Sequence, residues 1–361
     1  MRSIPLYATC CVAALTAGIA LAPPDALAWG HTGHVYISEL GIRMLPSEIP
    51  AFLRANPTVH EIAELGPEPD VSKSTGAVTG GAYPNIRTAG TIHDFERDPG
   101  HYIDLQDDGL VTGGVQFWPL LSSRRDFDTA LRASKLTPPS NTQYFAGYLP
   151  YNIVDGWQQV RKDFALFRAF RKAVETAQSP SDKAYFYYAL QLRQQLILRD
   201  IGVWSHFVAD GSQPLHVSVH FNGWGDYPNP NNYSDRPLHA PFEGALVKND
   251  VTIRQIAAAM LPYQDCGCAI EQRVVQYLQA TFTQVEPLYA LELNDPLFAN
   301  PNPDDVDFAT SRLAAGAAEL RDEIVDAWHS SETITVGYPL IKVSDIEAGT
   351  VTLTPDMLAG D

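Results

Sequence analysis

Two adjacent stretches with helical periodicity, residues 155–178 and 182–210, constrain the fold of this chain more than any other feature. Both repeat apolar side chains at the three-to-four-residue spacing of an amphipathic helix. A Ser-Pro-Ser break at 179–181 separates them, and Pro214 closes the second. We predict a helix over 155–178 and a long, deeply buried helix over 182–210. The apolar face of the second comprises Ala184, Tyr188, Leu192, Leu196 and Val203.

The rest of the sequence extends this pattern, so the predicted fold class is mainly α. Four more segments have helical periodicity: 33–54, 251–262, 270–292 and 306–329. Two stretches rich in Gly, Pro, Ser and Asn, 66–100 and 109–150, are expected to be loops that shape a surface cleft.

The end of the chain differs in composition from the rest. Residues 331–354 are rich in Thr, Val and Ile with Gly punctuation, which favours a short β-hairpin. Because the sequence contains no internal repeat or clear interdomain linker, we expect one main domain over 29–330. A small β-like appendage over 331–361 would follow it.

The first 28 residues have the pattern of a cleaved secretory signal. Arg2 precedes an apolar run from Ile4 to about Ala22, and Ala26-Leu27-Ala28 stands directly before Trp29. Two prolines and an aspartate end the apolar run, which favours cleavage over a retained membrane anchor. We therefore predict a secreted or periplasmic protein that begins at Trp29 and keeps no stable membrane span. No protein partner is implied.

Charge and cysteine content argue against some kinds of binding site. A formal net charge of -17 argues against simple electrostatic binding of a phosphate backbone, although bound divalent cations would lower that charge locally. Two of the four cysteines lie in the leader, which leaves Cys266 and Cys268. These two could form a tight local disulfide or remain thiols. A zinc knuckle would require a second pair.

The segment WSHFVADGSQPLH carries residues with metal-ligand chemistry. His206 and Asp210 are four apart on the long helix, so both project from one face with Cβ atoms about 5–6 Å apart. His216 follows beyond the expected helix end. Imidazole and carboxylate are ordinary zinc ligands, and the spacing suits one cation. A hydrogen-bonded ion pair is the alternative for the first two residues.

Two further segments repeat this chemistry. In PLHAPFE, His239 and Glu243 are again four apart, and Pro241 between them is tolerated only in the first turn of a helix. The alternative is a capped loop with a surface glutamate. In GHYIDL, His101 and Asp104 follow a Pro-Gly turn, with Asp70 upstream.

Cleavage before Trp29 would itself create a metal ligand. A free α-amino group has a pKa of about 7.7–8.0, so it loses its proton to a cation far more readily than lysine does. The amine and carbonyl oxygen of Trp29 would form a five-membered chelate ring. Gly30 and Gly33 would let the turn bring His34 to the same ion, and the indole would be a buried wedge.

From Trp29 to Glu243 the sequence resembles the zinc-dependent phospholipases C of bacteria and the single-strand-specific zinc nucleases of fungi and plants, which share one α-helical fold. The matching patterns are W-G-x-x-G-H, an Asp, H-x-x-D, H-x3-D-x5-H and H-x3-[DE]. The matching ligand positions are Trp29, His34, Asp70, His101, His206, Asp210, His216, His239 and Glu243.

The resemblance implies a cofactor of three zinc ions. The first would be held by Asp70, His101, His206 and Asp210, and the second by His216, His239 and Glu243. The third would be held by Trp29, His34 and the other oxygen of Asp210. A hydroxide bridging two zinc ions would be the nucleophile in phosphodiester hydrolysis. The implied catalytic residues are Asp70, Asp210 and Lys73, the last standing where the nucleases carry an arginine.

The substrate stays open between a phospholipid and single-stranded nucleic acid. Glu243, the HFNGW segment, the missing Gly-Gly-Asn element and the acidic balance lean slightly to a phospholipase C, whereas the gap from His216 to His239 resembles the nucleases. The segment 109–150 would be an insertion near the site. A third possibility is a secreted zinc-binding protein without activity.

Several residues near the expected ligands have other candidate roles. His220 is an alternative ligand in place of His216 or His239. Side chains that could touch the substrate, by stacking on a base or enclosing a quaternary ammonium group, are Tyr102, Phe221 and Trp224, and Asp104 is a further candidate.

Overall fold

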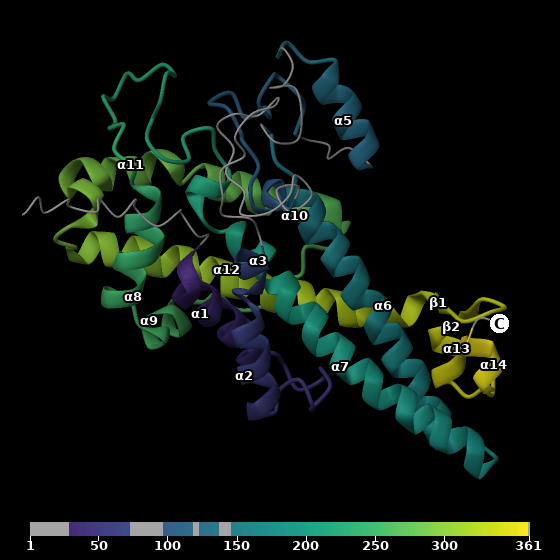
Figure 1. Cartoon of the computed structure of the whole chain (residues 1–361). Coiled ribbons are helices and arrows are strands. Elements are labelled where there is room, and N and C mark those ends of the chain that lie inside the picture. The colour runs from purple at the N-terminus through teal and green to yellow at the C-terminus, as the bar shows by residue number, and fades with distance from the viewer. Residues whose placement is uncertain (1–28, 73–96, 118–122, 137–145, 360–361) are drawn as a thin grey trace, which may run out of the picture.

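The computed structural model describes residues 29–72, 97–117, 123–136 and 146–359, and the fold is mainly α, as predicted. Two long helices, α6 (Leu149–Thr176) and α7 (Pro180–Asp210), run antiparallel and pack along much of their length (Figure 1). A third long helix, α12 (Pro303–Ser330), lies against both. These helices confirm the predictions for 155–178, 182–210 and 306–329, with starts three to six residues earlier for the first and third.

The residues that separate α6 from α7 also form the N-cap of α7. Ser179 accepts a hydrogen bond from the backbone N–H of Asp182, and Pro180 occupies the first turn, where its missing N–H costs nothing. Helix α12 begins in the same way, with a reciprocal capping box between Asn302 and Asp305. These local caps fix where α7 and α12 begin.

The predicted buried face of α7 is wrong. Tyr188, Leu192 and Leu196 are 65, 42 and 41% exposed. The opposite set packs into the core, and it comprises Phe186, Ile197, Ile201, Trp204 and Val208. Because this stretch carries apolar residues on both sides, periodicity identified the helix but did not identify the side that meets α6 and α12.

Helices α1 (Gly30–Arg43) and α2 (Asn56–Leu65) pack against each other and against α7. The prediction of one helix over 33–54 is therefore wrong after Arg43. Turns fill the space before α2, in a segment that contains Pro46 and Pro50. The short helix α3 (Glu68–Ser72) follows and contacts α7.

The stretch expected to be loop between 109 and 150 contains a helix, α5 (Arg124–Arg132), which corrects that prediction. Ser123 caps it by accepting from the N–H of Asp126, and it buries Phe127 and Leu131. Short 3-10 turns, η1 (Asp98–His101) and η3 (Pro214–His216), lie near the C-terminal end of α7.

The segment after α7 forms a group of shorter helices. A π-helical segment, η4 (Pro241–Leu246), leads into α8 (Val247–Asp250) and α9 (Ile253–Ala259). The predicted helix 270–292 is divided into α10 (Ile270–Phe282) and α11 (Val285–Asn294), and a 3-10 turn, η5 (Pro296–Phe298), follows. Among the described helices none is both long and apolar enough to cross a bilayer.

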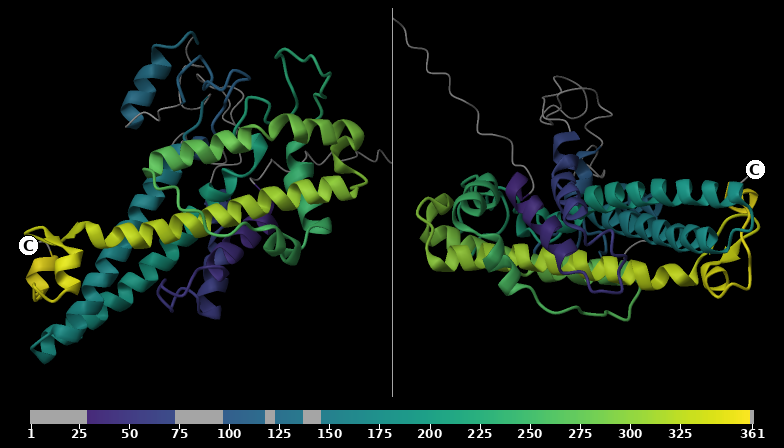
Figure 2. Two further views of the ribbon diagram at one scale, coloured as in Figure 1. Left: turned by 180° about the vertical axis from the view of Figure 1, so that it is seen from behind. Right: turned by 90° about the horizontal axis from the view of Figure 1, so that it is seen from below.

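The predicted hairpin near the C-terminus is confirmed. After the turn η6 (Ser331–Thr333), β1 (Thr335–Val336) pairs antiparallel with β2 (Ile341–Lys342). Two short helices, α13 (Val343–Glu347) and α14 (Pro355–Ala359), complete this appendage. It packs at one end of the long helices (Figure 2) around a small core of its own, to which α6 contributes Phe170 and α7 contributes Phe186.

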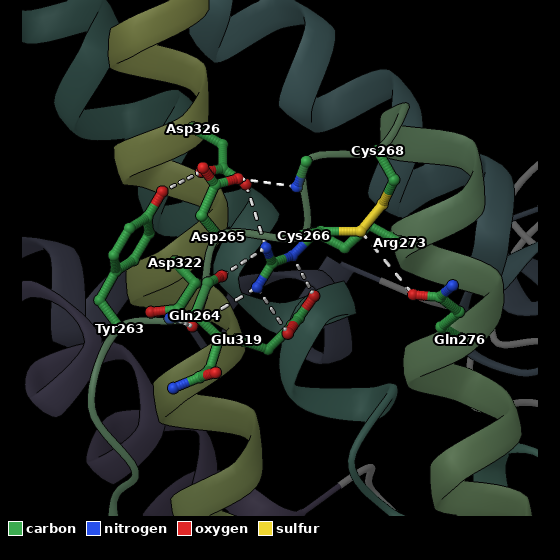
Figure 3. Close-up of a disulfide and its surroundings, with 11 residues drawn as sticks. Tyr263, Gln264, Asp265, Cys266, Cys268, Arg273, Gln276, Glu319, Asp322 and Asp326 are labelled. Atoms are coloured by element: carbon green, nitrogen blue, oxygen red, sulfur yellow. Dashed lines mark hydrogen bonds and ion pairs between the residues drawn. A yellow bond between two sulfur atoms is a disulfide. The ribbon is translucent and has the colours of Figure 1, made fainter.

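Cys266 and Cys268 form a disulfide, which settles the alternatives left open by the sequence. Cys266 is bonded to Cys268 in the connection between α9 and α10 (Figure 3). Beside it, the guanidinium of Arg273 donates to Glu319, Asp322 and Asp326 on α12. This charged network ties α10 to α12.

Candidate metal centre

Eight of the nine predicted ligand positions contribute a side chain to one buried centre. The donors form three groups, and within each group the ligand atoms all lie within 4.8 Å of one another. These groups are His34 with Asp70 and His206, His101 with His206 and Asp210, and His216 with His239 and Glu243. The residues come from α1, α3, η1, α7, η3 and the start of η4, so only the folded chain assembles them.

Asp210 lies between two sets of imidazoles at the C-terminal end of α7. Its Oδ1 is 3.5 Å from His34 Nε2, while its Oδ2 is 3.2 Å from His101 Nδ1 and 3.3 Å from His206 Nε2. All four side chains are buried. The two oxygens thus face different donors, as a bridging carboxylate requires.

Asp70 has the same relation to these histidines. Its Oδ2 is 3.8 Å from His34 Nε2, and its Oδ1 is 3.7 Å from both His101 Nδ1 and His206 Nε2. The resemblance implies that Asp70 serves the first ion alone. In the structure its two oxygens also face different imidazoles, at distances longer than those of Asp210.

The third group lies beside the first two. His239 Nε2 is 2.9 Å from Glu243 Oε2 and 3.1 Å from His216 Nε2. Pro241 occupies the first turn of η4, the one place where a proline between these residues is tolerated. Burial raises the pKa of Glu243, and the attraction of His239 opposes this shift.

Backbone carbonyls fix the orientation of three of the histidines. The Nδ1 atoms of His206, His216 and His239 lie 2.8, 2.5 and 2.8 Å from the carbonyl oxygens of Gly66, His101 and Phe221, respectively. An Nδ1–H that donates to a carbonyl leaves Nε2 unprotonated, so that its lone pair can bind a metal ion at the centre. Each Nε2 does face the other ligands. Carbonyl partners of this kind leave no signal in the sequence.

Gln213 is a polar partner that the sequence analysis missed. Its amide donates to Glu243 Oε2 at 3.2 Å, and its carbonyl accepts from the N–H of Leu215 at 2.7 Å. The side chain is fully buried. Its position between Asp210 and His216 in the sequence is the only signal that could have identified it.

The donor spacing fits zinc. A tetrahedral ion with bonds of about 2.0–2.1 Å separates neighbouring ligand atoms by about 3.3 Å, and the distances around Asp210 are 3.2 to 3.5 Å. Glu243 Oε1 is buried with no hydrogen-bond donor among the described residues. Three buried carboxylates in one centre also call for positive charge, which divalent cations would supply.

Trp29 directly precedes α1, the helix that carries His34. Its indole is fully buried, as predicted, and its N–H donates to the carbonyl of Ala209 and to Ser212 Oγ, each at 2.9 Å. Trp29 and Gly30 both have positive φ, and a Cβ added to Gly33 would lie 3.0 Å from that of Trp29. The N-terminal turn is thereby anchored one residue from Asp210. Coordination by the Trp29 amine and carbonyl stays a prediction.

The other predicted site residues are more scattered. Phe221 is 52% exposed, whereas Trp224 is buried, with its N–H on the carbonyl of Pro228 and its ring stacked on His220. Tyr102 and Asp104 follow His101 and are half-buried, and burial raises the pKa of Asp104 to about 8. Lys73 lies outside the described residues.

His220 stands apart from the three ligand groups. Its Nε2 is 2.8 Å from Asp107 Oδ1, and its Nδ1 is 2.8 Å from the carbonyl of Trp224. Both ring nitrogens are thus engaged outside the centre. His216 and His239 remain the candidates beside Glu243.

Comparison with known proteins adds little to this picture. No family model matches the chain, and no curated protein matches it significantly. Among solved structures, the crystal structure of Clostridium perfringens alpha-toxin from the avian strain SWCP aligns with a TM-score of 0.37 and 14% identity, covering 87% of this chain and 68% of the toxin. A similarity this low supports no conclusion on fold family or activity, so the function has to be argued from the site.

Proposed function

We propose that this protein is a secreted zinc-dependent phosphodiesterase with three zinc ions. The observation that carries the proposal is the convergence of eight histidine and carboxylate side chains, from elements distant in sequence, into three donor groups, two of which share His206. A structural zinc site closes all four positions with protein ligands, whereas three-ligand sets leave a position for water or substrate. The set of His216, His239 and Glu243, with three protein ligands, therefore favours catalysis.

The proposed ligand sets are those that the resemblance implies, and the set of His216, His239 and Glu243 coincides with one donor group. Asp70, His101, His206 and Asp210 would hold one ion, and His216, His239 and Glu243 another. The third would take His34, the second oxygen of Asp210, and the amine and carbonyl of Trp29. Bound zinc ions would supply Lewis acidity toward a phosphate oxygen and a nucleophile at neutral pH.

The chain's own residues prepare this centre before substrate arrives. Backbone carbonyls hold the rings of His206, His216 and His239, so that each Nε2 already faces inward. Asp70 and Asp210 hold the two sets of imidazoles at a fixed separation. Burial of these groups lowers the local dielectric constant, which would strengthen the attraction between an anionic phosphodiester and cations held at the centre.

The substrate class is a phosphate diester, and the choice between lipid and nucleic acid rests on residues around the centre. The slight lean of the sequence to a phospholipase C gains no support from Trp224, because its ring is buried and stacked on His220 instead of facing a headgroup. Single-stranded nucleic acid is favoured by arginines in the neighbouring cleft, which are considered below.

Metal content and turnover on a minimal substrate test the proposal together. The mature protein should contain three zinc ions by mass spectrometry and hydrolyse bis-p-nitrophenyl phosphate. Activity should be lost in EDTA and return with zinc. His206→Ala should abolish it, while His329→Ala, at an exposed histidine on α12, should not. A protein that holds zinc but hydrolyses neither this ester, phospholipid nor denatured DNA would instead be a non-enzymatic zinc-binding protein.

A further inference from the structure

A cleft beside the metal centre is lined by three arginines that the proposed reaction does not use. It has a volume of about 710 Å³, and its walls include His101 together with Arg97, Arg124 and Arg199. A second hollow of about 290 Å³ adjoins it and shares Arg124 and Arg199 with it. The cleft therefore has a proposed zinc ligand and three guanidinium groups in its walls.

Different elements supply these arginines. Arg97 directly precedes η1, Arg124 opens α5, and Arg199 lies on α7, two turns before His206. Arg97 donates to the carbonyl of Ser72 at 2.8 Å, which positions its side chain without neutralising it. Within the described part of the chain, Arg97 forms no ion pair with a carboxylate.

Arg124 and Arg199 keep donors available for a ligand. Arg124 uses Nη2 for Asn152 and Asp155, at 3.0 and 2.6 Å, and Arg199 uses Nη1 for Asp200 at 2.6 Å. The two arginines are 45 and 66% exposed, and exposed pairs of this kind are weak. Since a guanidinium has five N–H donors, each side chain can still bind an anion.

The charge of the cleft contrasts with that of the whole chain. Among the described residues that line the larger hollow, three are arginines and one, Glu68, carries a carboxylate, whereas the chain carries a formal net charge of -17. Asp155 and Asp200 of the second hollow balance the formal charge of these arginines, but the guanidinium N–H donors that they leave uncommitted favour an anionic ligand.

Two aromatic rings line the cleft together with these arginines. Tyr148 and Phe207 line the same cleft, and the guanidinium of Arg124 lies 5.4 Å from the centre of the Tyr148 ring. Phe207 contacts the rings of His101 and His206. A groove with guanidinium groups for phosphates and aromatic rings for bases is the general arrangement that binds a single nucleic-acid strand.

We propose that Arg97, Arg124 and Arg199 form a phosphate subsite that binds the backbone of a single-stranded nucleic acid next to the phosphodiester being hydrolysed. This inference rests on the proposed function, because the scissile phosphate is assigned to the metal centre. The subsite selects substrates that carry at least one further phosphate. It contributes to binding and positioning and takes no part in bond cleavage.

Substrates with and without a second phosphate test the subsite. The Arg97→Gln, Arg124→Gln, Arg199→Gln triple variant is compared with wild type on pentathymidylate and on bis-p-nitrophenyl phosphate. We expect kcat/KM for pentathymidylate to fall by roughly 10- to 100-fold, and its dependence on log salt to flatten by about 0.7 per arginine. Activity on the small ester should stay within twofold. Arg254→Gln, at an exposed arginine on α9, is the matched control.

A binding measurement separates failure of the subsite from failure of the proposed function. Fluorescence anisotropy of labelled phosphorothioate pentathymidylate reports affinity without turnover, and the triple variant should bind at least tenfold more weakly than Arg254→Gln. Equal binding, or an equal loss of activity on both substrates, overturns the subsite. Turnover of phosphatidylcholine vesicles by wild type and triple variant alike, without oligonucleotide cleavage, also overturns it. Loss of binding in a protein inactive on every ester would support the subsite and refute the phosphodiesterase.

Discussion

Replacing Asp210 with Asn removes the one carboxylate that the resemblance assigns to two ions. Oδ1 lies 3.5 Å from His34 Nε2, and Oδ2 lies 3.2 and 3.3 Å from His101 Nδ1 and His206 Nε2. Asparagine keeps the size of the side chain but offers one carbonyl oxygen and no negative charge. We therefore expect Asp210→Asn to lose the two ions beside it and to retain the one at His216, His239 and Glu243.

The size of the effect follows from linkage. Each ion stabilises the native state by about 2.7 kcal/mol when free zinc is one hundred times its Kd. Three ions would add about 8 kcal/mol, and the remaining one about 2.7 kcal/mol. The variant should therefore show about a third of the zinc-induced stabilisation. In EDTA the variant should be more stable than wild type, because it has one buried negative charge fewer near Asp70.

Three measurements check this expectation. Mass spectrometry counts zinc after dialysis, guanidinium unfolding with zinc and with EDTA gives the stabilisation, and hydrolysis of bis-p-nitrophenyl phosphate should fall by at least about 100-fold. Asp322→Asn is the control, since Asp322 is a buried carboxylate in the Arg273 network. It should lose stability equally in zinc and in EDTA and keep its zinc. An Asp210→Asn protein with three zinc ions and the wild-type rate would refute the shared-carboxylate arrangement.

Three further expectations concern other parts of the molecule. A cytosolic form that begins Met-Trp29 and keeps its methionine should fold but bind one zinc fewer, because the Trp29 amine is then an amide; a full zinc count contradicts this. Burial raises the pKa of Asp163 from 3.8 to about 6, against the opposing effect of Arg193. The native state then binds more protons than the unfolded state, so this group's contribution to stability should fall as pH rises from about 4 to 6 and then level off. Asp163→Asn should flatten that part of the unfolding profile, and an unchanged slope rejects the assignment. Opening the Cys266–Cys268 disulfide by Cys→Ser substitution at both positions should cost only about 1–2 kcal/mol in chemical denaturation, because the loop that it closes is very short; zinc loss in this variant would show an unexpected coupling to the centre.

The long helices could be predicted because their signals are local. Ser179 and Pro180 mark the start of α7 in the sequence and act as its cap in the structure. The buried side of α7 could not be predicted in the same way. Leu192 and Leu196 suit a core as well as Ile197 and Ile201 do, and only the packing of α6 and α12 decides between the two sides.

In the candidate site, too, local contacts could be predicted from the sequence and long-range contacts could not. The pairs His206 with Asp210 and His239 with Glu243 are four residues apart, so helical geometry alone predicts that each pair meets. Asp70 is different, because its approach to His34 and His101 depends on the short helix α3, which the sequence did not indicate. The three cleft arginines span about a hundred residues and share no pattern, so only tertiary structure brings them together.

Trp29, the predicted N-terminal residue, contributes to the fold through its indole and to the proposed chemistry through its backbone. Its indole is held by packing against Phe242 and by hydrogen bonds to Ala209 and Ser212, none of which involves the backbone amine. Its carbonyl accepts from the N–H of Gly33 at 3.2 Å and retains a second lone pair. Side-chain burial can therefore place Trp29 whether or not the leader is present. Because placement does not depend on the amine, removal of the leader would add a ligand to a centre whose histidines and carboxylates are already in position.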